Sequence, residues 1–367
     1  MAAEPTAGAS QVYTWEPSNA AIARRYGLER GQIVRFDTNT AATPPEGIEA
    51  LLCGPFDPPL NEYPDSSYED LTAAIARYAG VMPTEVLVAA GADEALDICA
   101  KTFLSAGTAA LVPVPTYAMY GVLTSQREAR IVAVPRLGPE AGFALDLDRL
   151  AESLPTAHLV WLCAPNNPTG APEPAGAIEQ VLQLAGRTED AAGAPVVVVD
   201  EAYHEFTGQT VVALRSRHPN LVVVRTLSKG FALAGIRVGY AIATRETIAR
   251  LERLRPPGSI STISAQLAAA ALADPSIARR AVAAVAAERG RLADGLAGIG
   301  WTPLPSVTNF VLVRVGDHGA AEVAADRLLR AGIVPRTFGP ANPLRGHLRL
   351  TVRSRSENDR LLEVLAA

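Results

Sequence analysis

The lysine at position 229 is the first residue whose type suggests chemistry. The chain has 33 basic residues, and only two of them, Lys101 and Lys229, are lysines. Arginine stays protonated in proteins, whereas a lysine amine can lose its proton and act as a nucleophile. A single lysine is most often an ordinary surface residue, so the neighbours of Lys229 must decide between the two interpretations.

Asp200 ends the apolar run PVVVVD. A buried carboxylate is costly unless a positive charge faces it, and a helix N-cap is the simpler explanation for an aspartate on its own. Facing a cationic ring nitrogen at about 4 Å, the carboxylate would gain on the order of 4 kcal/mol at an effective dielectric near 20. Such a pair would keep a pyridinium ring protonated and able to withdraw electrons.

Two further segments offer neutral hydrogen-bond donors. Asn167 lies in CAPNNPTG, which also fits a plain turn, and Tyr203 follows Asp200 in DEAY. Both side chains could donate to one phenolate oxygen. Tyr117, in PTYAMY, could stack on a flat aromatic ring or belong to the core.

An anion-binding cradle is predicted where AAGADEALD passes from a strand into a helix. The backbone N–H groups of Ala92 and Asp93 would be free at the helix start, although Asp93 can also simply cap the helix. Arg237 adds a charge that can bind two phosphate oxygens, and Thr226 and Ser228 add hydroxyl groups. One cofactor, pyridoxal 5′-phosphate, needs all five of these features: an amine, an acid, donors to a phenolate, an anion cradle and a stacking ring. The sequence therefore predicts that Lys229 forms an imine with the aldehyde of this cofactor.

Seven short apolar runs would position these side chains. They are rich in Val, Ile and Leu and are bounded by Pro, Gly or polar residues, which is typical of strands buried on both faces. Helical patterns lie between several of them, so we expect an α/β fold whose three-layer α/β/α domain has a mostly parallel seven-stranded sheet, with ligands beyond the carboxyl ends of its strands. The runs are 85–90, 109–115, 129–135, 158–165, 195–203, 220–228 and 238–243.

A different pattern begins after the breaker RPPGS at 255–259. One long alanine-rich helix over 264–300 is followed by a strand, a helix, a second strand and a last helix. We expect a large cofactor-binding domain over 40–256, and a small α+β domain formed by 1–39 and 257–367.

The composition excludes several classes of protein. The net charge is −5 without a basic cluster, so nucleic acid is not an expected partner. The three cysteines have no CxxC pairing, the N-terminus does not resemble a signal peptide, and the alanine-rich stretch carries too many charges to span a membrane. These features predict a cytoplasmic protein.

The order of the motifs resembles that of the fold-type I, class I/II aminotransferases. From about residue 10 to the end, the chain carries GADE, PTY, NNPTG, DEAY, SK with an arginine eight residues later, and a late arginine in LRLTV. Within that group it is most similar to the histidinol-phosphate aminotransferases, through the segments NEYPD, AGADEALD, PTYAMY, TLSKGFALAGIRVGY, TNFVLVR and LRLTVRSRSENDRLL.

The resemblance implies a role for each candidate residue. Lys229 would be the Schiff-base lysine and proton shuttle, Asp200 would pair with the ring nitrogen, and Tyr203 and Asn167 would hold the phenolate. Tyr117 would stack on the ring. The cofactor phosphate would bind to Ala92, Asp93, Thr226, Ser228 and Arg237.

The substrate side follows from the same resemblance. Arg349 would bind the acidic end of the substrate, Arg336 and Tyr13 would contact a substrate phosphate, and Tyr63 would reach the phosphate site of a partner subunit, which makes the active unit a homodimer. Two departures concern this region. The segment FDTNTAATPP at 36–45 keeps Asn39 but loses a glutamate usual in the family, and Arg353 stands where a glycine is usual.

The expected reaction converts histidinol phosphate and 2-oxoglutarate into imidazole-acetol phosphate and glutamate. An aromatic amino-acid aminotransferase, or a decarboxylase of a phosphorylated amino acid on the same scaffold, remains an alternative. A nicotinamide dehydrogenase is disfavoured because G-x-G-x-x-G is absent. A metal site is not expected, since His204 in DEAYHE lacks a second ligand cluster and should be exposed. The joint presence of Lys229, Asp200 and Arg349 disfavours a binding module without turnover.

Overall fold

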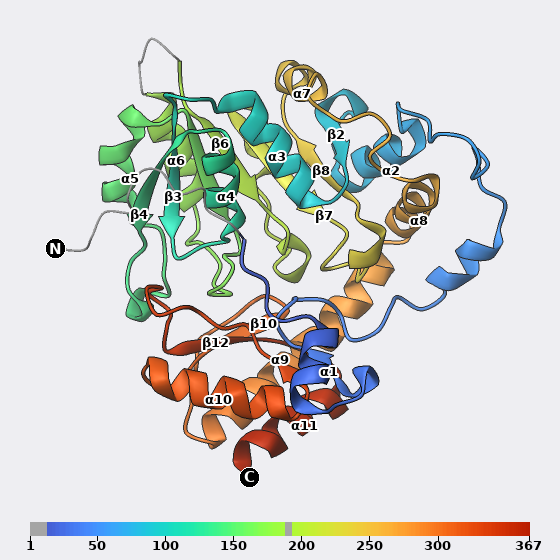
Figure 1. Cartoon of the computed structure of the whole chain (residues 1–367). Coiled ribbons are helices and arrows are strands. Elements are labelled where there is room, and N and C mark those ends of the chain that lie inside the picture. The colour runs from blue at the N-terminus through green and yellow to red at the C-terminus, as the bar shows by residue number, and fades with distance from the viewer. Residues whose placement is uncertain (1–12, 188–192) are drawn as a thin grey trace.

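The computed structural model describes residues 13–187 and 193–367. Within these parts of the chain, a seven-stranded sheet carries helices on both faces, and a smaller α+β assembly lies beyond the carboxyl ends of its parallel strands (Figure 1). No helix within the described residues combines the length and the apolar character needed to cross a membrane.

The strand order of the large sheet is β2-β8-β7-β6-β5-β3-β4. Strand β8 runs antiparallel to its two neighbours, and the other pairs are parallel. All seven apolar runs are confirmed as strands, which span Val86–Ala89 (β2), Ala109–Val114 (β3), Arg130–Pro135 (β4), Leu159–Cys163 (β5), Val196–Asp200 (β6), Leu221–Thr226 (β7) and Gly239–Ile242 (β8).

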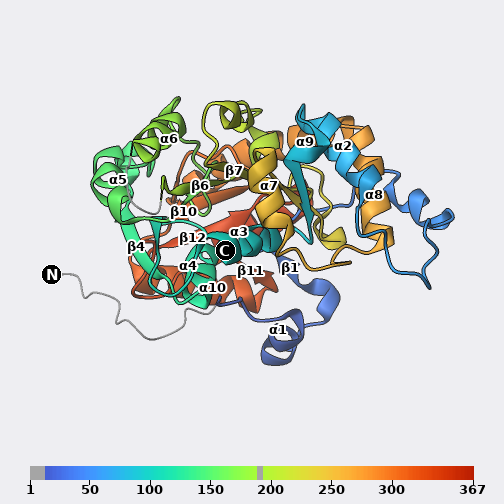
Figure 2. The same cartoon turned by 90° about the horizontal axis from the view of Figure 1, so that it is seen from above.

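Both faces of this sheet are buried except along the edge strand β4, and this burial explains the unbroken apolar runs of the other strands. In β6, Val197 and Val199 pack into one core and Val198 into the other. Burial of each valine contributes about 1.5–3 kcal/mol relative to exposure. The first core includes side chains of α2 (Glu69–Ala79), α5 (Leu147–Ser153), α6 (Ala177–Gly186) and α8 (Thr262–Ala273), and the second includes side chains of α3 (Ala92–Phe103), α4 (Met119–Gln126) and α7 (Arg245–Glu252) (Figure 2). The three-layer α/β/α prediction is therefore confirmed.

The smaller assembly combines both ends of the described chain. Its antiparallel sheet has the order β12-β10-β9, and β1 pairs in parallel with β11 in a second, two-stranded sheet. The strands are Val34–Arg35 (β1), Thr302–Pro303 (β9), Phe310–Arg314 (β10), Ile333–Val334 (β11) and His347–Thr351 (β12); the helices are Asn19–Tyr26 (α1), Ser276–Gly298 (α9), His318–Arg330 (α10) and Arg355–Ala366 (α11).

The alanine-rich stretch corrects one expectation, because it forms two helices and not one. Asp274 and Pro275 separate α8 from α9, and Pro275 has no N–H group with which to continue α8. Leu267 of α8 packs into the core of the large sheet, whereas Leu292 of α9 packs into the core of the small one. We therefore propose that the boundary between the two units lies within α9, somewhat after the predicted residue 257.

Candidate active site

A cleft of about 530 Å³ lies at the carboxyl ends of the large sheet's strands, where the small assembly closes over them. It brings together every predicted site residue except Tyr63: Tyr13, Asn39, Ala92, Asp93, Tyr117, Asn167, Asp200, Tyr203, Thr226, Ser228, Lys229, Arg237, Arg336 and Arg349. Parallel strands end at one common edge, so residues far apart in sequence meet there.

Lys229 follows the end of β7 and points its amine at the N-terminal segment of the chain. Its Nζ donates to the carbonyl oxygens of Thr38 at 3.2 Å and Asn39 at 3.0 Å. Burial, with the positive charge of Arg349 as a smaller cause, lowers the pKa of Lys229 to about 8. A useful fraction of the amine is therefore neutral near neutral pH and available as a nucleophile or base.

Asp200 is the last residue of β6 and is 4% exposed. Its Oδ1 accepts from the backbone N–H of Ala202 at 3.0 Å, and its Oδ2 accepts from the hydroxyl of Tyr120 at 2.8 Å. Burial raises the pKa of Asp200 to about 6, and the hydrogen bond from Tyr120 opposes that rise. A cation placed beside this carboxylate would relieve the cost of its burial.

Tyr120 is a functional candidate that the sequence analysis missed. It is fully buried, and its ring stacks on Trp161 with centroids 5.4 Å apart and planes 7° apart. The sequence signal was the spacing in PTYAMY, where Tyr120 lies three residues after Tyr117. In the structure the two rings meet edge-to-face. Only Tyr117 was singled out there, although residues three apart at a helix start share a face.

Asn39 with Tyr203, and Arg349 with Asn167, form two hydrogen-bonded pairs that line the cleft. The side-chain amide of Asn39 donates to the hydroxyl of Tyr203 at 2.9 Å. Arg349 donates to Oδ1 of Asn167 at 2.5 Å, which leaves the N–H groups of that amide as donors toward the cleft. Burial raises the pKa of Tyr203, so its hydroxyl stays protonated and can donate to an acceptor in the cleft.

The predicted anion cradle is present at the start of α3. Gly91 has φ +87° and turns the chain so that the first N–H groups of the helix face the cleft, and these groups have no partner within the helix. Arg237 lies against this turn, with Nη2 at 3.6 Å from Oδ2 of Asp93. Thr226 and Ser228 line the same cleft, and their hydroxyls are hydrogen-bonded to each other at 2.8 Å.

Two arginines lie together in the small assembly. Arg336 and Arg349 exchange backbone hydrogen bonds of 3.0 Å in both directions, and both side chains line the cleft. The guanidinium of Arg336 lies over the ring of Tyr13, 5.5 Å from its centroid. Nε of Arg349 is buried and has no hydrogen-bond partner among the described residues. An anionic ligand would satisfy it.

Two predicted features lie elsewhere. Tyr63 is 92% exposed and does not line the cleft, so its role in a partner subunit stays a prediction. The expectation of an exposed His204 is wrong. Its ring is 7% exposed because it starts a short 3-10 turn that packs against Tyr78, with Nδ1 3.3 Å from Glu205. Across 13–187 and 193–367, no group of three or more His, Cys, Asp or Glu side chains could hold a metal ion.

Comparisons with known proteins identify the family. The description Aminotransferase class I and II matches residues 32–365. This chain belongs to the class I and II aminotransferases. Histidinol-phosphate aminotransferase of Roseiflexus castenholzii is 36% identical over 98% of this chain and 96% of that protein, and the enzyme of the same name from Xanthomonas euvesicatoria is 38% identical over 86% and 88%.

Solved structures agree with this assignment. The histidinol-phosphate aminotransferase of Sinorhizobium meliloti, in complex with pyridoxal-5′-phosphate, has a TM-score of 0.84 at 29% identity and covers 96% of this chain and 94% of that one. The aspartate aminotransferase of Thermus thermophilus, with maleate, has a TM-score of 0.79 at 25% identity, over 96% of both chains.

The cofactor of this family is pyridoxal 5′-phosphate, and the residues of the cleft fit it. The buried carboxylate of Asp200 needs a cation, which a protonated pyridine nitrogen supplies. A Cβ atom at Gly91 would lie 2.6 Å from Nη2 of Arg237 and would force that side chain to move, and a glycine at such a turn is typical of a backbone cradle for a phosphate. The amine of Lys229 lies in the same cleft as both.

Proposed function

We propose that this aminotransferase moves an amino group between histidinol phosphate and 2-oxoglutarate, giving imidazole-acetol phosphate and glutamate. One observation carries the proposal: Arg336, Arg349 and Tyr13 lie together in the cleft that also holds Lys229. Two guanidinium groups beside a tyrosine suit a phosphate or a carboxylate, because arginine binds such groups through two parallel hydrogen bonds. The names of the similar proteins support the same substrate.

The mechanism assigns separate tasks to the residues of the cleft. When bound, pyridoxal phosphate supplies an aldehyde that exchanges amines and a cationic ring that withdraws electrons from the substrate Cα. Asp200 would hold the proton on the ring nitrogen, and Tyr203 and Asn167 would donate to the phenolate. Nζ of Lys229, with its lowered pKa, takes the proton from the substrate Cα and later returns a proton to the product. Ala92, Asp93, Thr226, Ser228 and Arg237 would hold the phosphate, and Tyr117 would cover the ring.

The decisive test offers three amino donors to the purified enzyme. Histidinol phosphate, glutamate and phenylalanine are each added alone, and the bleaching of the cofactor's visible absorbance is followed. We expect histidinol phosphate and glutamate to bleach it and phenylalanine to fail. Bleaching by phenylalanine alone would favour an aromatic amino-acid aminotransferase, and release of carbon dioxide from a phosphorylated amino acid would favour a decarboxylase.

We also propose that the active unit is a cytoplasmic homodimer in which Tyr63 contacts the cofactor phosphate of the partner subunit. The exposure of this aromatic side chain leaves it available to a partner subunit, and the resemblance to the family supplies the expected contact. Mixing inactive Lys229→Ala and Tyr63→Ala proteins tests it. Hybrid dimers hold one intact site and should regain activity, whereas no recovery after subunit exchange would refute the shared site.

A further inference from the structure

Three side chains on one face of β12 and its extension bind the segment Phe36–Ala41. Arg349, Thr351 and Arg353 are two residues apart, so they point to the same side of the extended chain. Arg349 donates to the carbonyl of Asp37, and the hydroxyl of Thr351 donates to that of Phe36 at 2.8 Å. Nη1 of Arg353 donates to the carbonyls of Thr40 at 3.3 Å and Ala41 at 3.0 Å.

The carbonyls of residues 36, 37, 40 and 41 are bound to β12 and its extension, and those of Thr38 and Asn39 accept from the amine of Lys229. The carbonyl of Asn39 also accepts from the side-chain amide of Asn309 at 2.8 Å, so Asn309 shares in holding it. Asn39 has φ +52°, a left-handed conformation that turns this stretch of backbone. Asparagine adopts this conformation more readily than most residues, and Asn39 is held by bonds from its backbone N–H to Thr351 and from its side chain to Tyr203.

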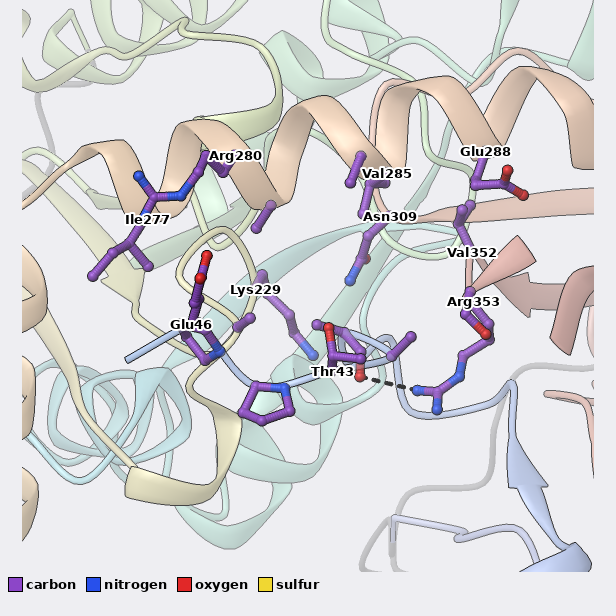
Figure 3. A pocket seen from close by; sticks show the side chains of 18 of the residues that line it. Thr43, Glu46, Lys229, Ile277, Arg280, Val285, Glu288, Asn309, Val352 and Arg353 are labelled. Atoms are coloured by element: carbon purple, nitrogen blue, oxygen red, sulfur yellow. Dashed lines mark hydrogen bonds between the residues drawn. The ribbon is translucent and has the colours of Figure 1, made fainter. Parts of the chain in front are cut away.

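Arg353 binds the backbone on the C-terminal side of the turn at Asn39, through its hydrogen bonds to Thr40 and Ala41. Beyond Ala41 the chain borders a second cavity of about 440 Å³, which Lys229 also lines, and Figure 3 shows Arg353 reaching the segment at one end of this cavity. A backbone next to a cavity gains little from packing on that side. Hydrogen bonds from Arg353 therefore carry much of the restraint on Thr40 and Ala41.

Arg353 is itself held from several directions. Its Nη2 donates to Oε1 of Glu357 at 2.9 Å, and its backbone N–H and carbonyl are both bonded to the side chain of Asn358. Burial alone would raise the pKa of Glu357, but hydrogen bonds from Arg353 and Ser354 outweigh it and lower that pKa. The guanidinium is thus fixed to the start of α11 and can fix the segment in turn.

We propose that Arg353 is a positioning residue for Lys229, whose amine it keeps in place by fixing the Thr40 and Ala41 backbone and so directing the carbonyls of Thr38 and Asn39. The importance of this arrangement rests on the proposed role of Lys229 in amino transfer. The arrangement itself is testable without cofactor or substrate.

The direction in which the pKa of Lys229 changes when Arg353 is replaced distinguishes a positioning role of Arg353 from a direct effect of its charge. Carbonyl acceptors stabilise the ammonium form, so losing them lowers the pKa of Lys229. Loss of a nearby positive charge would raise it instead. The other charged groups that line the two cavities around the amine are not changed when Arg353 is replaced. They are Asp37, Asp93, Asp200, Arg237, Arg336 and Arg349 in the cleft, and Glu46, Arg280, Glu288 and Arg355 on the second cavity.

The two-lysine composition makes this pKa measurable. Cofactor-free protein is labelled with a trace of acetic anhydride between pH 6 and 11, and mass spectrometry follows Lys229 against Lys101. Lys101 forms an ion pair with Asp97 on α3 and serves as the internal reference. The variants are Arg353→Ala, Arg353→Lys and, as a matched control, Arg355→Ala. Arg355 lines the same cavity, but its side chain donates no hydrogen bond to the described residues 36–41, so this control removes an equal charge without removing a bond to the segment.

We expect the pKa of Lys229 to fall by about half a unit to one unit in Arg353→Ala, by less in Arg353→Lys, and not at all in Arg355→Ala. A rise or no change in Arg353→Ala, or an equal fall in Arg355→Ala, would overturn the proposal. Should Arg353→Ala fail to fold, Arg353→Lys decides alone, and an unchanged pKa there refutes positioning. Failure of the substrate test above would leave these results intact, so the two proposals fail separately.

Discussion

Replacing Tyr120 by phenylalanine removes one buried hydroxyl group beside Asp200 and leaves the ring in place. The Tyr120 hydroxyl donates to Oδ2 of Asp200 at 2.8 Å, and the stack on Trp161 does not depend on that hydroxyl. A hydrogen bond to a charged group contributes about 1.5–3 kcal/mol, which corresponds to roughly one to two pKa units. The pKa of Asp200 should therefore rise from about 6 into the range of neutral pH.

The affinity for pyridoxal phosphate reports this change, because the ionised carboxylate is the form that binds a cationic ring. The dissociation constant of the cofactor is measured between pH 6 and 9.5 for wild type and Tyr120→Phe. We expect the variant to bind about two- to ten-fold more weakly at pH 7, with the difference vanishing toward pH 9.5 as Asp200 ionises in both proteins.

A matched control separates this effect from a general loss of stability. Tyr240, in β8, is equally buried, and its hydroxyl is bonded to Arg225 outside the cleft. Tyr240→Phe should leave cofactor affinity unchanged at every pH. The reasoning about Asp200 is refuted by a Tyr120→Phe effect that is the same at pH 6 and 9.5, or by an equal effect of Tyr240→Phe.

Three further predictions concern the same cleft. The pKa of Asp200 rises from 3.8 to about 6 on folding, so the cofactor-free wild type loses stability as the pH rises from about 4 to 6. In urea unfolding, the inactive variant Asp200→Asn should therefore be about 3 kcal/mol more stable than wild type above pH 6 and equally stable below pH 4. Gly91→Ala places a Cβ 2.6 Å from Arg237 and should weaken cofactor binding about ten-fold or more, whereas Gly107→Ala, with the same φ of +87° and open space around it, should not. Arg349→Lys should raise KM for glutamate about 10- to 100-fold with a smaller change in kcat, and an unchanged KM would contradict its role as the substrate clamp.

The sequence was sufficient to predict the large sheet and most of the cleft, for a physical reason. Strands buried on both faces are written as continuous apolar runs, and polar residues that end such runs must meet at one edge of the sheet. Asp200 and Asn167 were identified in this way. Pro275 indicates in the sequence that α8 ends before α9 begins. The alanine-rich pattern on both sides of this proline nevertheless suggested one helix.

Other features depend on contacts that sequence spacing does not encode. The environment of His204 was predicted wrongly because its burial depends on Tyr78, which lies on α2 far earlier in the chain. The bond between Arg353 and Ala41 joins residues 312 positions apart. Arginine at position 353 was visible as a departure from the family pattern, but its partners follow only from how the extension of β12 lies against the N-terminal segment.

The hydrogen bonds of Arg349 explain how one residue can both hold this segment and bind a substrate. A guanidinium has five N–H donors in a fixed plane. Nη2 donates to the carbonyl of Asp37 and Nη1 to Asn167, while Nε has no partner. A substrate acid can therefore use donors that the protein leaves free, and the bond to Asp37 need not break. β12 and its extension carry both Arg349, which would bind the substrate acid, and Arg353, which we propose to place the Lys229 amine, so both tasks depend on the same stretch of chain.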